Sequence, residues 1–183
     1  MSRMIQALGI LMVLGGVAWA ADGVVYNRYN IHAGTDAKGT TLKASYANYT
    51  DPGPGHFVVK MNTPIRIGGV SSKGFTVSLD DGKVIQFEYH EPRMGMPVAD
   101  YIKKITADAP VPVDGLSALD KQGVEQGKAL VGMSREGVMA ALGYPAAHKT
   151  PSLTAATFVY WTNRFATLAV DFDADGKVTA VRH

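Results

Sequence analysis

Three aspartates near the C-terminal end have the spacing of a calcium-binding loop. Asp171, Asp173 and Asp175 occupy alternate positions, and Gly176 follows them. Calcium loops of the EF-hand type need carboxylate ligands at the first, third and fifth positions and a bidentate glutamate at the twelfth. Counted from Asp171, the twelfth position is Arg182, which is a cation. The pattern therefore begins like a metal site and lacks the ligand that completes one.

The same stretch also fits a tight turn between two strands. Leu168, Val170 and Phe172 alternate with other residues, which is typical of a strand rather than of the helices that flank a calcium loop. A similar sequence occurs twice, as DDGKV at 80–84 and ADGKV at 174–178. Asp-Gly pairs favour hairpin turns. The sequence predicts two such turns and no bound metal, with a weak cation site at the second turn as the alternative.

The histidines show no catalytic or metal-binding spacing. They are His32, His56, His90, His148 and His183. None has a second histidine placed four residues away, the spacing that brings two imidazoles to one face of a helix. His90 adjoins Glu91 at the expected end of a strand, a pair that can transfer protons, but no candidate nucleophile lies near it in the sequence. We interpret His90 as a polar surface residue.

Ser134 is the residue most easily taken for a nucleophile, and its surroundings indicate another role. It lacks the Gly-x-Ser-x-Gly sequence that exposes a catalytic serine at a strand-to-helix turn. It precedes a helical pattern, where a serine side chain accepts a hydrogen bond from the helix N-terminus. The sequence therefore predicts no catalytic residue, no cofactor and no enzymatic activity.

Aromatic residues near the C-terminal end form a candidate site for a partner protein. Strand alternation directs Tyr160 and Trp161 to opposite faces, and the following turn includes Arg164 and Phe165. Tyrosine, tryptophan and arginine are enriched at interaction hot spots. The hypothesis is that Tyr160, Trp161, Arg164 and Phe165 contact a partner. The alternative is that these aromatic side chains pack within the protein, between its two parts.

The composition limits the class of protein. The chain has 183 residues, of which 46% are hydrophobic, enough for a substantial core in one domain or two small ones. The net charge of +2 is too small to indicate binding to nucleic acid. Because the chain contains no cysteine, it has neither disulfide bonds nor a lipid-attachment site.

Residues 1–20 have the pattern of a cleavable secretory signal peptide. Arg3 precedes an apolar run from Ile5 to Val17, which is shorter than the roughly 20 residues needed to span a bilayer. The sequence Ala-Trp-Ala at 18–20 provides the small residues that a signal peptidase reads. The sequence predicts a soluble, monomeric periplasmic protein that is not a lipoprotein and has no stable membrane insertion. An uncleaved membrane anchor is the alternative.

The segment 24–92 has the pattern of a small strand-rich domain. Short runs of β-branched and aromatic residues alternate with turn-forming residues, and the clearest hairpin spans 74–91. About five or six short strands in this length predict a small closed barrel. Prolines interrupt 93–115, which predicts a connector with a short helix over 98–107.

The C-terminal third has the pattern of two helices followed by three strands. The first helix is predicted over 117–132, and its residues Ser117 and Asp120 form a capping box. The second begins after Ser134 and ends at Gly143, which we expect in the left-handed conformation. The whole chain is therefore predicted to be α+β, with a small β-barrel followed by two helices on a three-stranded antiparallel sheet.

One set of residues combines the capped second helix with an aromatic strand and the Asp-Gly turn. The set is Gly132, Met133, Ser134, Val138, Leu142, Gly143, Pro145, Phe158–Tyr160, Val170–Phe172 and Gly176–Val178. With these residues, the segment 116–183 resembles the SmpA/OmlA (BamE-like) family of outer-membrane assembly lipoproteins. The resemblance implies two helices on a three-stranded sheet and a role in envelope assembly. The chain departs from the family in having no anchoring cysteine and in carrying an additional N-terminal strand-rich region.

The segment ASYANY at 44–49 is the basis of a second, weaker resemblance. It is similar to the tyrosine-rich segment of bacterial Src-homology-three-like barrels, which hold proline-rich peptides. The resemblance implies a barrel over 24–92 and a peptide-binding role for Tyr46 and Tyr49. The alternative is that these tyrosines simply fill one face of a strand.

These observations favour a non-enzymatic protein-interaction or scaffold module of the cell envelope. The alternatives are a periplasmic enzyme inhibitor, since the expected fold also occurs in β-lactamase inhibitory proteins, and an unrecognised hydrolase. A pocket that places His90, Glu91 or His56 beside a serine or aspartate would favour an enzyme. An exposed patch around Trp161 and Phe165 would favour a binding protein.

Overall fold

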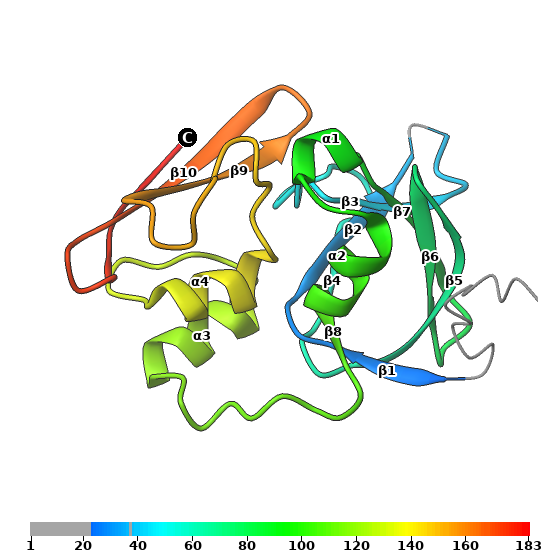
Figure 1. Ribbon diagram of the computed structural model, residues 1–183, viewed down its shortest axis with the longest axis horizontal. Helices are drawn as coiled ribbons and strands as arrows, with labels where there is room; N and C mark the ends of the chain where they lie inside the picture. Colours follow the sequence, from blue (N-terminus) through cyan, green and yellow to red (C-terminus); the bar gives the residue numbers. More distant parts are fainter. Residues whose placement is uncertain (1–22, 37) are drawn as a thin grey trace, which may run out of the picture.

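The computed structural model describes residues 23–36 and 38–183, so the predicted signal peptide at 1–20 lies outside the described residues. The described chain is mixed α+β, as predicted, with an eight-stranded sheet, a three-stranded sheet and four helices (Figure 1). The large sheet occupies one side of the molecule, and the small sheet with helices α3 and α4 occupies the other (Figure 1).

The eight-stranded sheet curls into a half-barrel. Its strands are β1 (Val24–Asn27), β2 (Ile31–Thr35), β3 (Leu42–Ser45), β4 (Phe57–Val59), β5 (Pro64–Ser71), β6 (Gly74–Leu79), β7 (Val84–Glu88) and β8 (Thr106–Ala107). Their order is β4-β2-β3-β7-β6-β5-β1-β8, and all neighbours are antiparallel except β3 and β7. The expected closed barrel is therefore wrong. The two edge strands, β4 and β8, are short and offer few backbone groups with which to close a barrel.

The short helix expected in the connector forms, and it fills the concave side of the half-barrel. Helix α1 (Glu91–Met94) leads into α2 (Val98–Ile105), whose residues Tyr101 and Ile102 are fully buried. They belong to the same core as the strand residues Ile65 and Val77. The apolar face of α2 covers apolar side chains of the sheet that the open half-barrel would otherwise leave in contact with water.

The C-terminal unit, residues 116–183, contains the other two helices and the small sheet. Helices α3 (Ala118–Gln126) and α4 (Arg135–Leu142) precede strands β9 (Thr157–Asn163), β10 (Ala166–Phe172) and β11 (Val178–Arg182). The strands form an antiparallel meander in the order β11-β10-β9. Helix residues and alternate strand residues share one core, which includes Val138, Leu142, Phe158, Tyr160 and Val170.

The predicted helix caps are confirmed. Ser117 and Asp120 form a capping box at the start of α3, and the Ser134 hydroxyl accepts a hydrogen bond of 3.0 Å from Gly137 N–H at the start of α4. The Asp120 carboxylate also accepts the Ser134 N–H at 2.7 Å, which ties the two helix starts together. The hydrogen-bonding capacity of Ser134 is thus used structurally.

The helix ends differ from the prediction in two details. Helix α3 stops at Gln126 rather than extending to residue 132, because Gly127 adopts a left-handed conformation (φ 64°, ψ 37°). Gly143 ends α4 as predicted, but with φ 94° and ψ 174° it lies outside the left-handed helical region. A positive φ of this kind still favours glycine.

Buried amides join the half-barrel to the C-terminal unit. Asn30, just before β2, donates from its side chain to Val124 O at 2.7 Å, and its oxygen accepts Met61 N–H at 2.8 Å. Asn48 donates to Tyr144 O at 2.6 Å. We call this contact region of Asn30, His32 and Asn48 the joint. Its backbone partners lie at the ends of α3 and α4, so the joint fixes the C-terminal unit on the half-barrel.

Candidate binding cleft

The turn between β9 and β10 presents an aromatic side chain to solvent. The Asn163 side-chain oxygen accepts hydrogen bonds from Phe165 N–H at 2.9 Å and Ala166 N–H at 3.2 Å. Asparagine side chains commonly stabilise turns by accepting hydrogen bonds from backbone N–H groups that follow in the sequence. The Phe165 side chain at the tip is 91% exposed, and the Arg164 guanidinium lies 5.8 Å from its ring centroid.

The hairpin is fixed above the half-barrel by backbone hydrogen bonds. Thr50 N–H donates to Trp161 O and Asp51 N–H donates to Thr162 O, both at 2.8 Å. These bonds continue the small sheet onto the loop after β3, so that the β9–β10 hairpin extends toward the half-barrel (Figure 1). The position of the tip is therefore a property of the fold rather than of the turn alone.

Beneath the tip lies a cleft of about 910 Å³, which we call the hairpin cleft. Strands β2, β3, β5, β6 and β7 and the turn at 163–165 line it. Tyr49, which is half-buried, supplies aromatic surface to its lining, whereas the neighbouring Phe75 and Phe87 are buried in the core. Charged side chains of both signs surround this surface, namely Asp36, Lys43, Lys73, Glu88 and Arg164. A lining that combines apolar and charged side chains is a typical arrangement for binding a peptide segment or a small molecule.

The structure divides the predicted partner-binding residues into two groups. Arg164 and Phe165 are exposed and line the hairpin cleft, as the hypothesis requires. Tyr160 is fully buried, and its hydroxyl donates to Gly143 O at 3.1 Å, so the expectation that it contacts a partner is wrong. Trp161 is half-buried and stacks on His148 with ring centroids 5.5 Å apart. Strand alternation sent Tyr160 under the helices and left Trp161 to pack between the two parts of the molecule.

The residues that carried the resemblance to the assembly family have structural roles here. Gly132 N–H donates to Val178 O at 2.7 Å, and Val178 N–H donates to Met133 O at 2.9 Å, which fastens the start of α4 to β11. The side chains that accompany them are buried in the same core, namely Met133, Val138 and Leu142, and Pro145 is also buried. These residues hold the C-terminal unit together and do not face the hairpin cleft.

The aspartate-rich stretch is a hairpin turn, as predicted. Gly176 has φ 75°, and the Asp173 carboxylate accepts Lys177 N–H at 2.8 Å. Asp171 is paired with the Arg182 guanidinium at 2.6 Å, and this hydrogen-bonded pair lowers the pKa of Asp171 to about 2. Arg182, which stands where a calcium loop has its glutamate, is thus the ion-pair partner of Asp171.

The tyrosine-rich segment ASYANY at 44–49 does not form an exposed peptide-binding face. Tyr46 is 4% exposed, and its hydroxyl accepts a hydrogen bond of 2.8 Å from Arg93. Tyr49 is half-buried and contributes to the hairpin cleft. The predicted role of Tyr46 in holding a peptide is therefore wrong, since packing against Tyr89 covers its ring.

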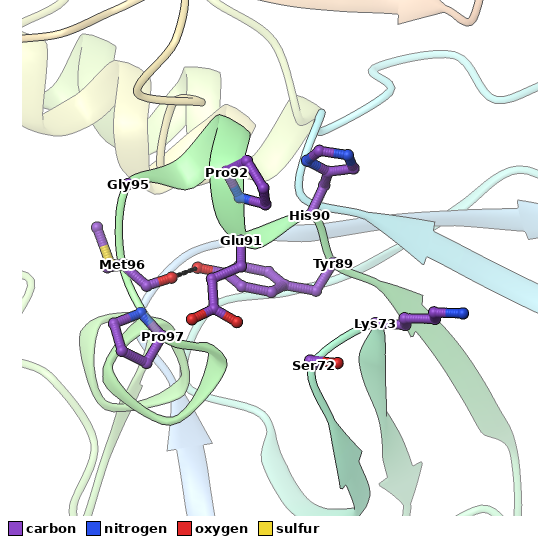
Figure 2. Close-up of a pocket in the computed structure, with 9 residues that line it drawn as sticks. All are labelled: Ser72, Lys73, Tyr89, His90, Glu91, Pro92, Gly95, Met96 and Pro97. Atoms are coloured by element: carbon purple, nitrogen blue, oxygen red, sulfur yellow. Dashed lines mark hydrogen bonds between the residues drawn. The ribbon is translucent and has the colours of Figure 1, made fainter.

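A shallower groove of about 610 Å³ lies beside α1 and contains His90, Glu91 and Ser72, the residue types that would favour an enzyme. Figure 2 shows the His90 ring and the Glu91 carboxylate extending in opposite directions. The His90 ring lies 6.1 Å from the Tyr46 ring. The hydroxyl of Tyr89 donates to Met96 O at 2.8 Å, and burial raises its pKa to about 12 (Figure 2). This groove therefore presents no paired acid and base.

Two histidines that the sequence gave no reason to pair lie in contact. His32 Nδ1 is 3.2 Å from His56 Nε2, and His32 Nε2 is 3.0 Å from Ala141 O. Burial lowers the pKa of His32 to about 4, so its imidazole is neutral near pH 7. Their separation of 24 positions has no helical or strand periodicity, so only the fold brings them together. His32 is 5% exposed.

Within the described residues, no group of three or more histidine, cysteine or acidic side chains is arranged to hold a metal ion. None of the helices in that part of the chain has the length and apolar character needed to cross a bilayer. Comparisons with protein-family models, with curated proteins and with solved structures found no match.

Proposed function

We propose that this protein is a non-enzymatic binding module that holds a segment of a partner protein in the hairpin cleft. The observation that carries the proposal is the 91% exposure of Phe165 at the lip of the cleft. A large aromatic side chain that is held out by a fixed turn loses little conformational entropy on binding. Covering its ring removes apolar surface from water.

The remaining features of the hairpin cleft support a peptide as the ligand. Its accessible aromatic side chains, Tyr49 and Phe165, can contact apolar side chains of a ligand. Its rim combines the cations Lys43, Lys73 and Arg164 with the anions Asp36 and Glu88. Charges of both signs around an apolar centre match a polypeptide, which carries donors, acceptors and apolar groups along its length, better than a uniformly charged polymer.

We further propose that the module works in the cell envelope, after export through a signal peptide at residues 1–20. The resemblance of residues 116–183 to the BamE-like assembly family supports a scaffold role there. The chain lacks the cysteine through which that family is anchored. It would therefore act as a soluble, monomeric component that meets its partner in the periplasm.

An inhibitor of a periplasmic enzyme remains the second candidate, because an exposed hairpin tip above a cleft also suits insertion into an enzyme's active site. The two candidates differ in which surface is enclosed. A scaffold would cover Phe165 and the cleft with a peptide of the partner. An inhibitor would place Phe165 in a pocket of the enzyme and leave the half-buried Tyr49 in the cleft without contact.

The proposal is tested by photo-crosslinking and affinity measurement in envelope extracts. A photoreactive residue at position 165 should crosslink to one dominant partner, whereas one at the exposed Val131 should not. With the purified partner, Phe165→Ser should weaken binding by roughly 30-fold or more, the loss expected for an aromatic hot spot of about 2 kcal/mol. Val131→Ser, which also removes an exposed apolar side chain, should leave the affinity unchanged. Equal affinity of Phe165→Ser and the unmodified chain would overturn the proposal.

A further inference from the structure

His32 and His56 form a pair of imidazoles whose facing nitrogen atoms are 3.2 Å apart. His32 lies on β2 and belongs to the joint, and His56 follows the glycine-rich loop that precedes β4. His32 is buried whereas His56 is exposed. The pair therefore has one fixed member and one member that solvent can reach.

The hydrogen bonds of His32 determine which of its nitrogens is free. A backbone carbonyl only accepts, so the Nε2–H of neutral His32 donates to Ala141 O at 3.0 Å. Nδ1 then carries a lone pair, which accepts the Nε2–H of His56. A histidine whose second nitrogen donates to a backbone carbonyl has the arrangement that orients metal-binding imidazoles. Gly127 supports the ring from the other side, since a Cβ at that position would lie 3.1 Å from His32 Cε1.

The separation of the two nitrogens matches the requirement of a shared metal ion. Two metal–nitrogen bonds of about 2.05 Å place the nitrogens about 3.3 Å apart at a tetrahedral angle and about 2.9 Å apart at a right angle. The observed distance of 3.2 Å lies between these values. Because the ring centroids are 5.4 Å apart, the two nitrogens face each other almost in line. An ion can therefore enter only after the exposed His56 side chain swings aside and turns its Nε2 toward the ion.

We propose that His32 Nδ1 and His56 Nε2 form a two-histidine site for a divalent transition-metal ion, with water completing the coordination. Imidazole ligands suit Cu²⁺, Ni²⁺ and Zn²⁺, and the general order of affinities makes Cu²⁺ the tightest of the three. The proton that occupies His56 Nε2 moves to its Nδ1 by exchange with water, so both ligands remain neutral. His32 also lines the hairpin cleft, but the metal site does not include Phe165 and does not depend on the proposed peptide binding.

The surroundings of the pair allow an ion to approach. The positive charge of Lys60 acts on His32, and the Lys60 ammonium is paired with the Glu125 carboxylate at 3.3 Å, which offsets its repulsion of a cation. Gly53 and Gly55, with φ values of 100° and 66°, give the loop before His56 backbone conformations that other residues rarely adopt. Because the His56 side chain is exposed, it can rotate without disturbing the joint.

The site is tested with Cu²⁺ as the probe, in the presence of glycine as a weak competing chelator. Electron paramagnetic resonance of the full chain with one equivalent of Cu²⁺ should show coupling to two imidazole nitrogens. His56→Gln should reduce this to at most one. It should also weaken binding by more than the roughly 10- to 100-fold that loss of an outer-shell partner costs. His148→Gln, which removes an exposed imidazole stacked on Trp161, is the matched control and should retain both nitrogens.

Thermal unfolding gives a second readout that does not depend on the spectrum. Cu²⁺ that binds the folded protein raises its melting temperature. We expect this shift in the unmodified chain and in His148→Gln, and none in His56→Gln. Because His56 is exposed, this variant should fold normally, as circular dichroism can verify. Absence of stoichiometric binding, or equal binding by His56→Gln, would show an adventitious ion only and overturn the proposal.

Discussion

The joint and the hairpin cleft connect the same two parts of the molecule in opposite ways. In the joint, polar side chains are buried and their hydrogen bonds are satisfied: Asn30 is 2% exposed and bonds to three backbone groups. In the hairpin cleft, the two parts face each other across open space, and Phe165 is 91% exposed. The comparison indicates that the joint fixes the geometry of the molecule, whereas the cleft leaves apolar surface free for a partner.

The difference has an energetic consequence. A buried hydrogen-bonded amide contributes little net stability but costs much when one partner is removed, because its other partners remain buried without water. An exposed aromatic side chain contributes little to folding, because its surface is solvated before and after. Substitutions in the joint should therefore affect stability, and substitutions at the cleft should affect binding.

The largest expected effect is that of Asn30→Leu. The substitution leaves Val124 O, Ala141 O and Met61 N–H without their side-chain partner in the joint. We expect a loss of about 4 kcal/mol in the free energy of unfolding, from unsatisfied buried groups at about 1–3 kcal/mol each. Urea unfolding followed by circular dichroism measures it. Gln126→Leu, an exposed change on α3, is the control, and a comparable loss in both variants would contradict the role of the joint.

Acid should weaken the joint through His32. The unfolded chain binds a proton at this residue near pH 6.5, whereas the folded protein, with the His32 pKa lowered to about 4, does not. The contribution of neutral His32 is therefore complete above pH 6.5 and is lost as the pH falls toward 4. At about 1.4 kcal/mol per pH unit, the loss reaches about 3 kcal/mol at pH 4.

Comparison with His32→Gln isolates this effect from that of the carboxylates. Glutamine can still donate to Ala141 O but has no proton to gain in this range. The difference in unfolding free energy between the two proteins, measured from pH 7 to pH 4.5, should shrink as the pH falls. A constant difference would mean that His32 titrates alike in the folded and unfolded states.

Gly143→Val tests the backbone at the edge of the joint, with an expected loss of about 2 kcal/mol. Gly143 has φ 94°, which costs a β-branched residue about 1–2 kcal/mol, and its new Cβ would lie 2.7 Å from Asn48 Oδ1. Gly82→Val is the matched control, because Gly82 has φ 85° and open space around the new side chain. The excess loss at Gly143, read from thermal unfolding, reports the contact with Asn48. Equal losses would remove Asn48 from the explanation.

The features that the sequence predicted correctly are local. Ser117 and Ser134 cap helices because the groups they bond lie within three residues, and the Asp-Gly turns depend on four consecutive residues. The division of β9 into a buried and a less buried face follows from strand alternation. Solvent reaches only one of the two faces, and the other half of the molecule decides which. The sequence pattern alone could not decide this, and for that reason Tyr160 was predicted to contact a partner.

The joint and the histidine pair depend on contacts between residues far apart in the sequence, which periodicity does not encode. The bond from Asn30 to Val124 O spans 94 positions, and the contact between His32 and His56 spans 24. The prediction of a closed barrel was wrong for a similar reason. The parallel pairing of β3 with β7 and the shortness of the edge strands β4 and β8 are properties of the assembled sheet. The turn carrying Arg164 and Phe165 combined a local sequence signal with a position in the lining of the hairpin cleft.

The smallest expected effect on stability, and the one that most sharpens the comparison, is that of Phe165→Ser. The Phe165 ring makes no buried contact, so the unfolding free energy should change by less than about 0.5 kcal/mol. The double variant with Asn30→Leu should lose no more stability than Asn30→Leu alone, because substitutions at distant sites act independently and Phe165→Ser has almost no effect of its own. A loss of 1 kcal/mol or more in urea unfolding would show that the tip closes onto the cleft in solution. The cleft would then belong to the core of the protein, and a partner would have to displace Phe165 instead of covering it.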